Sequence, residues 1–243
     1  MINNFVSDTE KFELYDNDGN GGTSDDYGLF VDFLAPMPMA EQKYTDSNVG
    51  EDEIRTAPDN VFNNVVYTIR FYTFLNEDYN DTAIKAFCFG KTILKLSRFP
   101  GYYFKIRKVS LSAADGSGYG KRIDYTLSLT LTPFRYTVSN PQVTLASGDS
   151  IVNEHTRCSR PEFEVTGTGD ITITVNGSEF TVKGLTTNQT IIIDSQRNVT
   201  YSGSELLTGK TEGKYPLLDV GSNTVSWTGS ISSIKYKGNW RDY

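Results

Sequence analysis

RPEFEVTGTGDITITVNGSEFTVKGLTTNQTIIID, residues 160–194, is the part of the chain whose pattern indicates the fold most clearly. Phe163 and Val165 alternate with polar residues, and Ile171 and Ile173 alternate with threonines. This period of two indicates strands with one buried face. Residues that tolerate a positive φ separate the alternating segments at 167–170, Asn176-Gly177 and Lys183-Gly184. The stretch therefore predicts four antiparallel strands joined by turns.

The rest of the C-terminal half has the same character. Further short strands are expected at 191–194, 199–201, 217–218, 221–227 and 231–236, with a turn at Thr228-Gly229-Ser230. A sheet with one apolar face must bury that face against a second layer. This half is therefore predicted to be a β-sandwich.

The N-terminal half is predicted to be a second β domain, a β-sandwich or split barrel. Its strands are expected at 29–34, 61–75, 92–96, 102–111 and 123–131, whereas 1–15 fits either a short helix or a strand. Pro133 is expected to end the last strand, because proline cannot donate a hydrogen bond to a ladder. The boundary is placed in the polar segment 136–140, which gives domains of 1–136 and 137–243.

One short helix interrupts this domain. Asn80 or Asp81 can cap it, and Gly90 can end it. The apolar residues that follow the cap recur at the i, i+3, i+4 spacing of one helical face. They are Ile84, Phe87 and Cys88.

Composition and charge exclude some classes of function. The 243 residues are 37% hydrophobic and 22% charged, which suits two domains that each bury a core. The formal net charge of −7 argues against specific nucleic-acid binding. Residues 1–59 hold fourteen acidic and three basic residues, whereas 82–114 hold seven basic and no acidic ones. These stretches are either solvated faces or surfaces through which identical subunits dock by complementary charge.

Few residues offer reactive chemistry. Cys88 and Cys158 are expected to be free thiols in different domains, and the single histidine, His155, is expected in a surface loop. No nucleophile, base and oxyanion-stabilising group can be named together, so the chain is predicted to be neither an enzyme nor dependent on a cofactor. It shows no signal-peptide pattern and no apolar run of roughly 20 residues, so synthesis in a cytoplasm and no membrane span are expected.

The segment DNDGNG at 16–21 resembles the opening half of a calcium loop. Asp16, Asp18 and Asn20 would supply oxygen ligands, with a glycine in sixth place. The twelfth place holds Tyr27 instead of a bidentate glutamate, and the apolar run that follows looks like a strand. The segment is therefore either a calcium site or a flexible acidic turn.

Residues 41–57 form a polar insertion that could not enter a core. Its large apolar side chains are Tyr44, Val49 and Ile54, and residues 47–50 could reverse two short strands into a projecting hairpin. Such insertions are either mobile loops or become ordered against a partner.

Taken together, the motifs resemble the distal tail protein (Dit) family of long-tailed, non-contractile bacteriophages. The resemblance spans most of the chain and rests on the order and spacing of several short pieces. They are NVVYTIRF at 64–71, KLSR at 95–98, GYYF at 101–104, DYTLSLTLTPF at 124–134, Asn153, PEF at 161–163, GTGDI at 167–171, VNG at 175–177, Ile193-Asp194, Tyr215-Pro216, GSN at 221–223 and Trp240-Arg241.

The resemblance implies a structural protein at the tip of a virion tail. Six copies would form a ring from their N-terminal domains, each with a galectin-like C-terminal β-sandwich, and the hairpin at 41–57 would clasp the next subunit. The partners would be the tail tube protein, the tail-associated hub protein and, in some phages, receptor-binding or other baseplate proteins.

The alternative is a carbohydrate-binding tail module that recognises host cell-wall glycans. A galectin-like fold does not by itself bring sugar binding, because lectin sites of that kind need clustered His, Asn and Arg with a stacking Trp. Trp227 alternates with Val225 as a core residue would, and His155 is distant in sequence.

Overall fold

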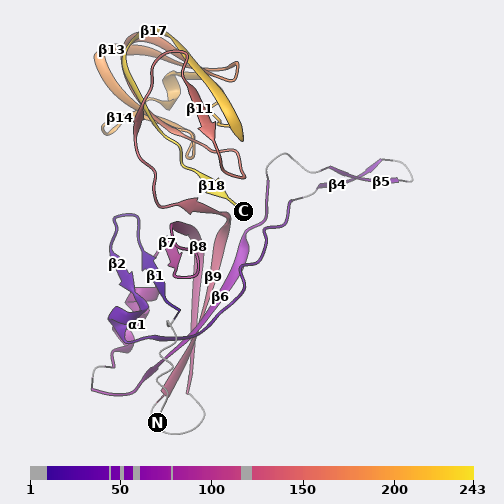
Figure 1. Ribbon diagram of the computed structural model, residues 1–243, viewed down its shortest axis with the longest axis vertical. Coiled ribbons are helices and arrows are strands. Elements are labelled where there is room, and N and C mark those ends of the chain that lie inside the picture. Colours follow the sequence, from indigo (N-terminus) through magenta and orange to yellow (C-terminus); the bar gives the residue numbers. More distant parts are fainter. Residues whose placement is uncertain (1–9, 44, 50–51, 57–60, 78, 116–121) are drawn as a thin grey trace. The chain divides into compact units, whose positions relative to one another are not determined.

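The computed structural model of this chain describes residues 10–43, 45–49, 52–56, 61–77, 79–115 and 122–243, with the backbone alone for 45–49, 52–56 and 114–115 (Figure 1). The chain divides into two compact units. The first comprises residues 1–135 with Tyr243, and the second comprises residues 136–242. Each unit has its own buried core. None of the helices in these described ranges is long and apolar enough to cross a membrane.

The first unit is mainly β with one α-helix. Its elements are, in chain order, β1 (Phe12–Tyr15), β2 (Gly21–Thr23), the 3-10 helix η1 (Ser24–Tyr27), β3 (Phe30–Leu34), β4 (Thr45–Val49), β5 (Asp52–Thr56), β6 (Val65–Phe74), α1 (Asp81–Cys88), β7 (Ile93–Leu96), β8 (Tyr102–Asp115) and β9 (Arg122–Thr137). The main sheet has the order β2-β1-β7-β8-β9-β6-β3, and β4 and β5 form a separate two-stranded sheet.

The predicted helix is confirmed together with its cap. The Asn80 side chain accepts a hydrogen bond from the Ala83 N–H at 3.0 Å. Ile84, Phe87 and Cys88 are buried, so the apolar face inferred from spacing is the face that packs on the core. This short helix is held mainly by that burial, since isolated helices of its length are marginal in water.

Strand β6 shows why one face of this sheet is buried. Tyr67, Ile69 and Phe71 alternate with more exposed residues, and all three pack in the first core. The strand pairs with β9 from Val65↔Leu131 to Phe74↔Arg122. The prediction that Pro133 ends β9 is wrong, because this proline lies beyond the last pair with β6 and β9 continues to Thr137. Pro133 has no backbone N–H to donate, but the β6–β9 ladder has already ended before this position, so no hydrogen bond of that ladder is lost.

The second unit is built on one eight-stranded antiparallel sheet. Its elements are β10 (Val143–Thr144), β11 (Ser150–Asn153), β12 (Glu162–Val175), β13 (Ser178–Asp194), β14 (Val199–Ser202), β15 (Glu205–Leu206), the 3-10 helix η2 (Thr208–Lys210), β16 (Thr211–Gly213), β17 (Gly221–Lys237) and β18 (Arg241–Asp242). The order is β10-β17-β12-β13-β14-β15, with β11 also paired to β17 and β16 to β13.

Residues 160–194 contain two long strands and not the four predicted. Only Asn176-Gly177 reverses the chain, and the two predicted turns on either side lie within β12 and β13. The turn predicted at 228–230 likewise lies within β17. At these places the ladders shift register instead of ending, so the glycines form bulges.

The three bulges lie beside one another and bend the sheet. The register shifts of β12 near 167–172 occur against both neighbouring strands, and the Asp170 carboxylate accepts a hydrogen bond from the Gly184 N–H at 2.8 Å. Figure 1 draws β13 and β17 as long curved ribbons. Phe163 and Ile193 on one side of the bulges share a core cluster with Ile173 and Phe180 on the other. The predicted β-sandwich is therefore made by one sheet that bends over its own core.

Candidate assembly surface

The base of the predicted hairpin is closed by backbone hydrogen bonds. The Lys43 N–H donates to the Val61 carbonyl at 2.9 Å, and the Asn63 N–H donates to the Glu41 carbonyl at 2.9 Å. The Phe62 ring packs edge-on against Phe134 with its centroid at 5.2 Å. The chain thus leaves and re-enters the first unit at one anchored point.

Beyond this base, β4 and β5 pair with each other. The register runs from Thr45↔Thr56 to Val49↔Asp52, and neither strand joins another strand within the described ranges. Tyr44 lies outside the described residues, and the structure gives only the backbone of Val49 and Ile54. A hairpin at this place is confirmed, whereas the contact role of these three side chains stays a prediction.

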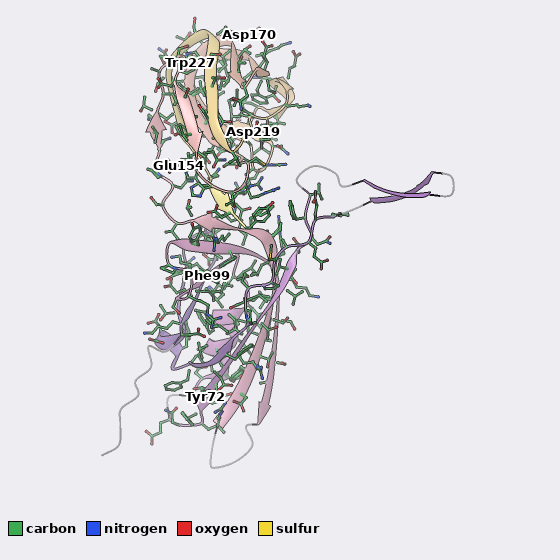
Figure 2. All side chains as sticks on the ribbon, turned by 45° about the vertical axis from the view of Figure 1, so that its right-hand side comes forward. Tyr72, Phe99, Glu154, Asp170, Asp219 and Trp227 are labelled. Carbon is green, nitrogen blue, oxygen red and sulfur yellow. The ribbon has the colours of Figure 1, made fainter. Side chains whose placement is uncertain are left out.

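An exposed aromatic patch covers the outer face of β3 and β6. Phe30, Phe33 and Phe74 are 45%, 39% and 44% exposed, which is unusual for phenylalanine. The Phe30 ring lies 5.3 Å from Tyr72 and 5.9 Å from Phe74 between centroids. Tyr72 is labelled in Figure 2. We call these four residues the aromatic patch.

Two arginines hold the aromatic patch in place. Arg122 lies over the Tyr72 ring at 3.8 Å, and Arg70 lies over the Phe33 ring at 4.8 Å. Strand β3 is an edge of its sheet, so its outer backbone groups have no strand partner among the described residues. Exposed apolar patches beside an open edge typically mark protein interfaces. The β-branched and aromatic content of residues 61–75 predicted a strand but not that one of its faces is exposed, so this patch was not predicted.

An apolar groove lies beside the base of the hairpin, with a volume of about 400 Å³. Met37, Met39, Phe99 and Tyr243 are among its lining residues, and Met39 is 85% exposed. Figure 2 labels Phe99. Flexible methionines are common in surfaces that adapt to a protein partner.

The oppositely charged stretches are partly matched within the first unit. Strand β1 pairs with β7, so acidic residues near the N-terminus face basic residues of the later stretch. The ion pairs that join the two stretches are Glu10–Arg98, Glu13–Lys95 at 3.5 Å and Asp16–Lys91 at 4.0 Å. This internal matching is a third arrangement that the sequence analysis did not consider.

The predicted calcium segment forms the turn of the β1–β2 hairpin. The Asp16 carboxylate accepts hydrogen bonds from the backbone N–H groups of Asp18 at 3.0 Å and Asn20 at 2.8 Å. These bonds, led by the one from Asn20, lower the pKa of Asp16. The Lys91 ammonium donates to the Asn20 carbonyl at 3.1 Å. A lysine therefore already occupies the side of the turn where a cation would interact with Asp16 and Asn20.

Reactive groups do not converge in the parts of the chain that the structure describes. Burial raises the pKa of the Cys88 thiol to about 12, so this cysteine stays protonated at neutral pH. Cys88 and Cys158 are both buried free thiols. No group of three or more His, Cys, Asp or Glu side chains there is placed to hold a metal ion.

His155 is held in a network and is not a free surface side chain. Its Nδ1 lies 3.0 Å from Asp242 Oδ2, and its ring stacks on Trp240 at 5.6 Å between centroids. Thr156 donates to Asp242 Oδ1 from its N–H at 2.8 Å and its hydroxyl at 3.0 Å. Trp227 packs against the second core, and Figure 2 shows Trp227 and Glu154 at opposite ends of the second unit. The galectin-type combination of histidine and Trp227 is therefore not gathered in one place.

We expect Asp242→Asn to destabilise the second unit by about 2 kcal/mol at neutral pH, because three hydrogen bonds to a buried carboxylate are weakened. Burial would raise the pKa of Asp242, but the bonds from Thr156 and His155 outweigh it and lower the pKa. Because the pKa of Asp242 is lowered in the folded state, the carboxylate stabilises the fold at pH values above its pKa in the unfolded chain, about 3.9. This stability is lost as the pH falls through the pKa of the folded state.

Urea unfolding at pH 6.5 and pH 3, followed by tryptophan fluorescence, measures this effect. The difference between wild type and Asp242→Asn should shrink at pH 3. Glu154→Gln changes an exposed neighbouring carboxylate and should behave as wild type. An equal loss at both pH values would contradict the assignment to the charged form of Asp242.

The fold was compared with known proteins. No protein-family model matches the chain, and no curated protein matches it. Among solved structures, SPP1 Dit, described as a paradigm of the hub adsorption apparatus in phages that infect Gram-positive bacteria, matches with a TM-score of 0.67 at 12% identity. The match covers 94% of this chain and 98% of that chain.

Two structures of the phage P2 baseplate in its activated conformation also match. The one with Ca has a TM-score of 0.57 at 9% identity and covers 97% of this chain and 98% of that chain. The one with Sr has a TM-score of 0.57 at 10% identity, and the match covers 94% of this chain and 97% of that chain. The chain therefore has, over nearly its whole length, the fold of SPP1 Dit and of these phage baseplate proteins.

Proposed function

We propose that this chain is a non-enzymatic structural protein of the tip of a bacteriophage tail. Its copies form a hexameric ring that joins the tail tube to the hub and receptor-binding apparatus. The likeness to SPP1 Dit and to the phage P2 baseplate chains supports this, because it covers both units and not one widespread domain.

The observation that carries the proposal is the hairpin of β4 and β5. It forms a sheet of its own and is anchored at its base by Lys43 and Asn63. A closed ring needs a heterologous contact, in which an element of one subunit meets a different surface of the next. The hairpin would be that element, and the first unit would be the part that forms the ring.

The surfaces of the first unit suit further contacts. The aromatic patch and the apolar groove both expose clustered apolar side chains, and such clusters mark sites of interaction with other proteins. In the proposed ring, these surfaces meet neighbouring subunits or the tail tube and hub proteins. The galectin-like second unit would face the receptor-binding proteins.

Size-exclusion chromatography with light scattering tests the ring directly. We expect a particle of six times the 27.1 kDa mass of one chain, or an assembly whose mass rises steeply with concentration. The same sample viewed by electron microscopy should show closed rings. A species that stays at 27.1 kDa across the whole concentration range would refute the proposal.

A further inference from the structure

The second unit contains an open cleft with a volume of about 640 Å³. It lies between residues 195–198, which connect β13 to β14, and residues 213–219, which begin at the last residue of β16. Its lining residues include Arg160, Ser195, Asn198, Lys214, Tyr215 and Asp219. Figure 2 labels Asp219. The volume is in the range of sites that hold small molecules, roughly 300–1,000 Å³.

The wall formed by residues 213–219 is fixed at both ends. The Tyr215 ring packs on Phe180 at 4.5 Å between centroids, and its hydroxyl lies 3.3 Å from the Thr200 hydroxyl. At the other end, the buried Asn223 side chain accepts from the Asp219 N–H at 2.7 Å and donates to the Asp219 carbonyl at 2.9 Å. The cleft is therefore largely pre-formed, which lowers the entropy cost of binding.

Two cations in the cleft have no partner. The second unit, described without gaps, contains nine Lys and Arg residues. Lys183, Lys210, Lys235, Lys237 and Arg197 each pair with a carboxylate, Arg241 donates to the Cys158 carbonyl, and Arg157 also makes an interaction.

In this unit only Arg160 and Lys214 make neither a hydrogen bond from the side chain nor an ion pair, and both line the cleft. Asp219 lines it too, but no ion pair within 4.0 Å joins it to either cation. Arg160 and Lys214 are exposed, and two cations that line one cleft without a carboxylate partner are available to hold an anion there.

Ser195 provides a second, independent observation. This residue is 1% exposed and lines the cleft, and its hydroxyl has no hydrogen-bond partner in the described structure. Its own N–H donates to the Pro161 carbonyl at 3.1 Å, which fixes the backbone there. A buried hydroxyl without a partner is costly, so such a group in a folded protein usually meets a water, an ion or a ligand, and the cleft is where Ser195 can meet one.

We propose that this cleft binds a small hydroxylated molecule that carries an anionic group, either a phosphate ester of a polyol or an acidic sugar. Arg160 and Lys214 hold the anion, while Asp219 and Ser195 form hydrogen bonds with hydroxyl groups of the same molecule. The cleft requires both the anionic group and the hydroxyl groups of the ligand, and this requirement distinguishes it from a site that binds any anion. This proposal does not depend on the formation of a ring.

An NMR titration of the full chain, in which shifts of the protein's own amide signals report the apparent Kd of each ligand, tests this at millimolar ligand, since small fragments bind weakly. Glycerol 3-phosphate and glucuronate are the two probes, and glycerol and inorganic phosphate are their partial counterparts. We expect at least one probe to bind with a lower apparent Kd than either counterpart. A signal from glycerol 3-phosphate alone identifies a phosphate ester, and one from glucuronate alone identifies an acidic sugar.

The double variant Arg160→Ala/Lys214→Ala should raise the apparent Kd of the bound probe at least about tenfold, because it removes two charge-assisted contacts. Lys183→Ala/Lys235→Ala removes the same charge from two cations that do not line the cleft and should leave binding unchanged. Ser195→Ala should weaken the binding of the probe without affecting the binding of inorganic phosphate. The proposal is overturned if no probe exceeds its counterparts, or if both double variants bind like the wild type.

Discussion

Replacing Gly229 with alanine is expected to destabilise the second unit by about 2–4 kcal/mol. Gly229 has φ 94°, a conformation that costs an L-residue on the order of 1–3 kcal/mol. A Cβ added there would overlap the Asp170 carbonyl oxygen and lie 3.0 Å from Ile171 Cα. Both neighbours are backbone atoms of the adjacent strand β12, so a side-chain rotation cannot relieve the overlap.

Urea unfolding followed by tryptophan fluorescence measures this effect on the second unit alone, because both tryptophans of the chain, Trp227 and Trp240, lie in it. Two control variants separate the causes. Gly203 has φ 56°, and a Cβ added there would have no atom within 4 Å. Gly203→Ala should therefore lose only the stability that the backbone conformation costs an L-residue, about 1 kcal/mol.

Gly209→Ala has neither a positive φ nor a close neighbour and should change stability by less than about 0.5 kcal/mol. Equal losses in Gly229→Ala and Gly203→Ala would show that the overlap with Asp170 does not matter. The close packing of the bulges would then not be what holds the bend in the sheet.

These bulges explain where sequence analysis succeeded and where it failed in the second unit. The alternation that identified the strands, and the Asn176-Gly177 turn, are confirmed. Lys183-Gly184 was correctly recognised as a place that tolerates a positive φ, but both it and Gly229 were wrongly interpreted as turns. A bulge and a tight turn require the same residues, and only the register against neighbouring strands distinguishes them.

The first unit shows the same division between local and non-local information. The helix at Asp81–Cys88 could be predicted because its cap and its apolar spacing are close in sequence. The exposure of Phe74 could not be predicted, since it depends on β3 being the edge strand of the sheet beside β6. The pairing of Glu10 with Arg98 required knowing that β1 lies beside β7.

The same limit applies to the candidate sites. The hairpin of β4 and β5 could be predicted because the polarity of the insertion is a local feature, but its reversal was placed at 47–50, and residues 47–49 lie within β4 and pair with β5. The cleft of the second unit could not, because Arg160 and Lys214 meet only when β12 and β16 both pair with β13. Whether a lysine or arginine has an ion-pair partner also depends on the folded chain, and no sequence pattern reports it.

Removal of the hairpin is expected to abolish ring assembly without unfolding the subunit. Residues 44–60 can be replaced by a Gly-Ser-Gly-Ser loop, because Lys43 and Val61 are already joined by a backbone hydrogen bond of 2.9 Å. Strands β4 and β5 pair with no other strand in the described ranges, so the main sheet loses no ladder. The free energy of unfolding of the monomer should change by less than about 1 kcal/mol, since shortening a loop alters its closure entropy only slightly.

A finer variant keeps the hairpin and changes its predicted contacts. Tyr44→Ser/Val49→Ser/Ile54→Ser removes the large apolar side chains at the positions expected to touch the next subunit. At about 1 kcal/mol or more for each truncated side chain, the subunit concentration needed for assembly should rise by at least about a hundredfold. Ser47→Ala/Asn48→Ala changes polar residues of the same strand and should assemble as the wild type does.

Analytical ultracentrifugation over a wide concentration range compares these proteins, and circular dichroism melting confirms that each is folded. Rings of wild-type size from the hairpin-deleted chain would rule out the hairpin as the ring contact, and the aromatic patch with the open edge of β3 would become the next candidate. Loss of assembly in the deletion but not in the triple variant would assign the contact to the hairpin backbone. Strand addition at an exposed sheet edge would then explain the ring better than side-chain packing, because backbone hydrogen bonds survive truncation of the side chains.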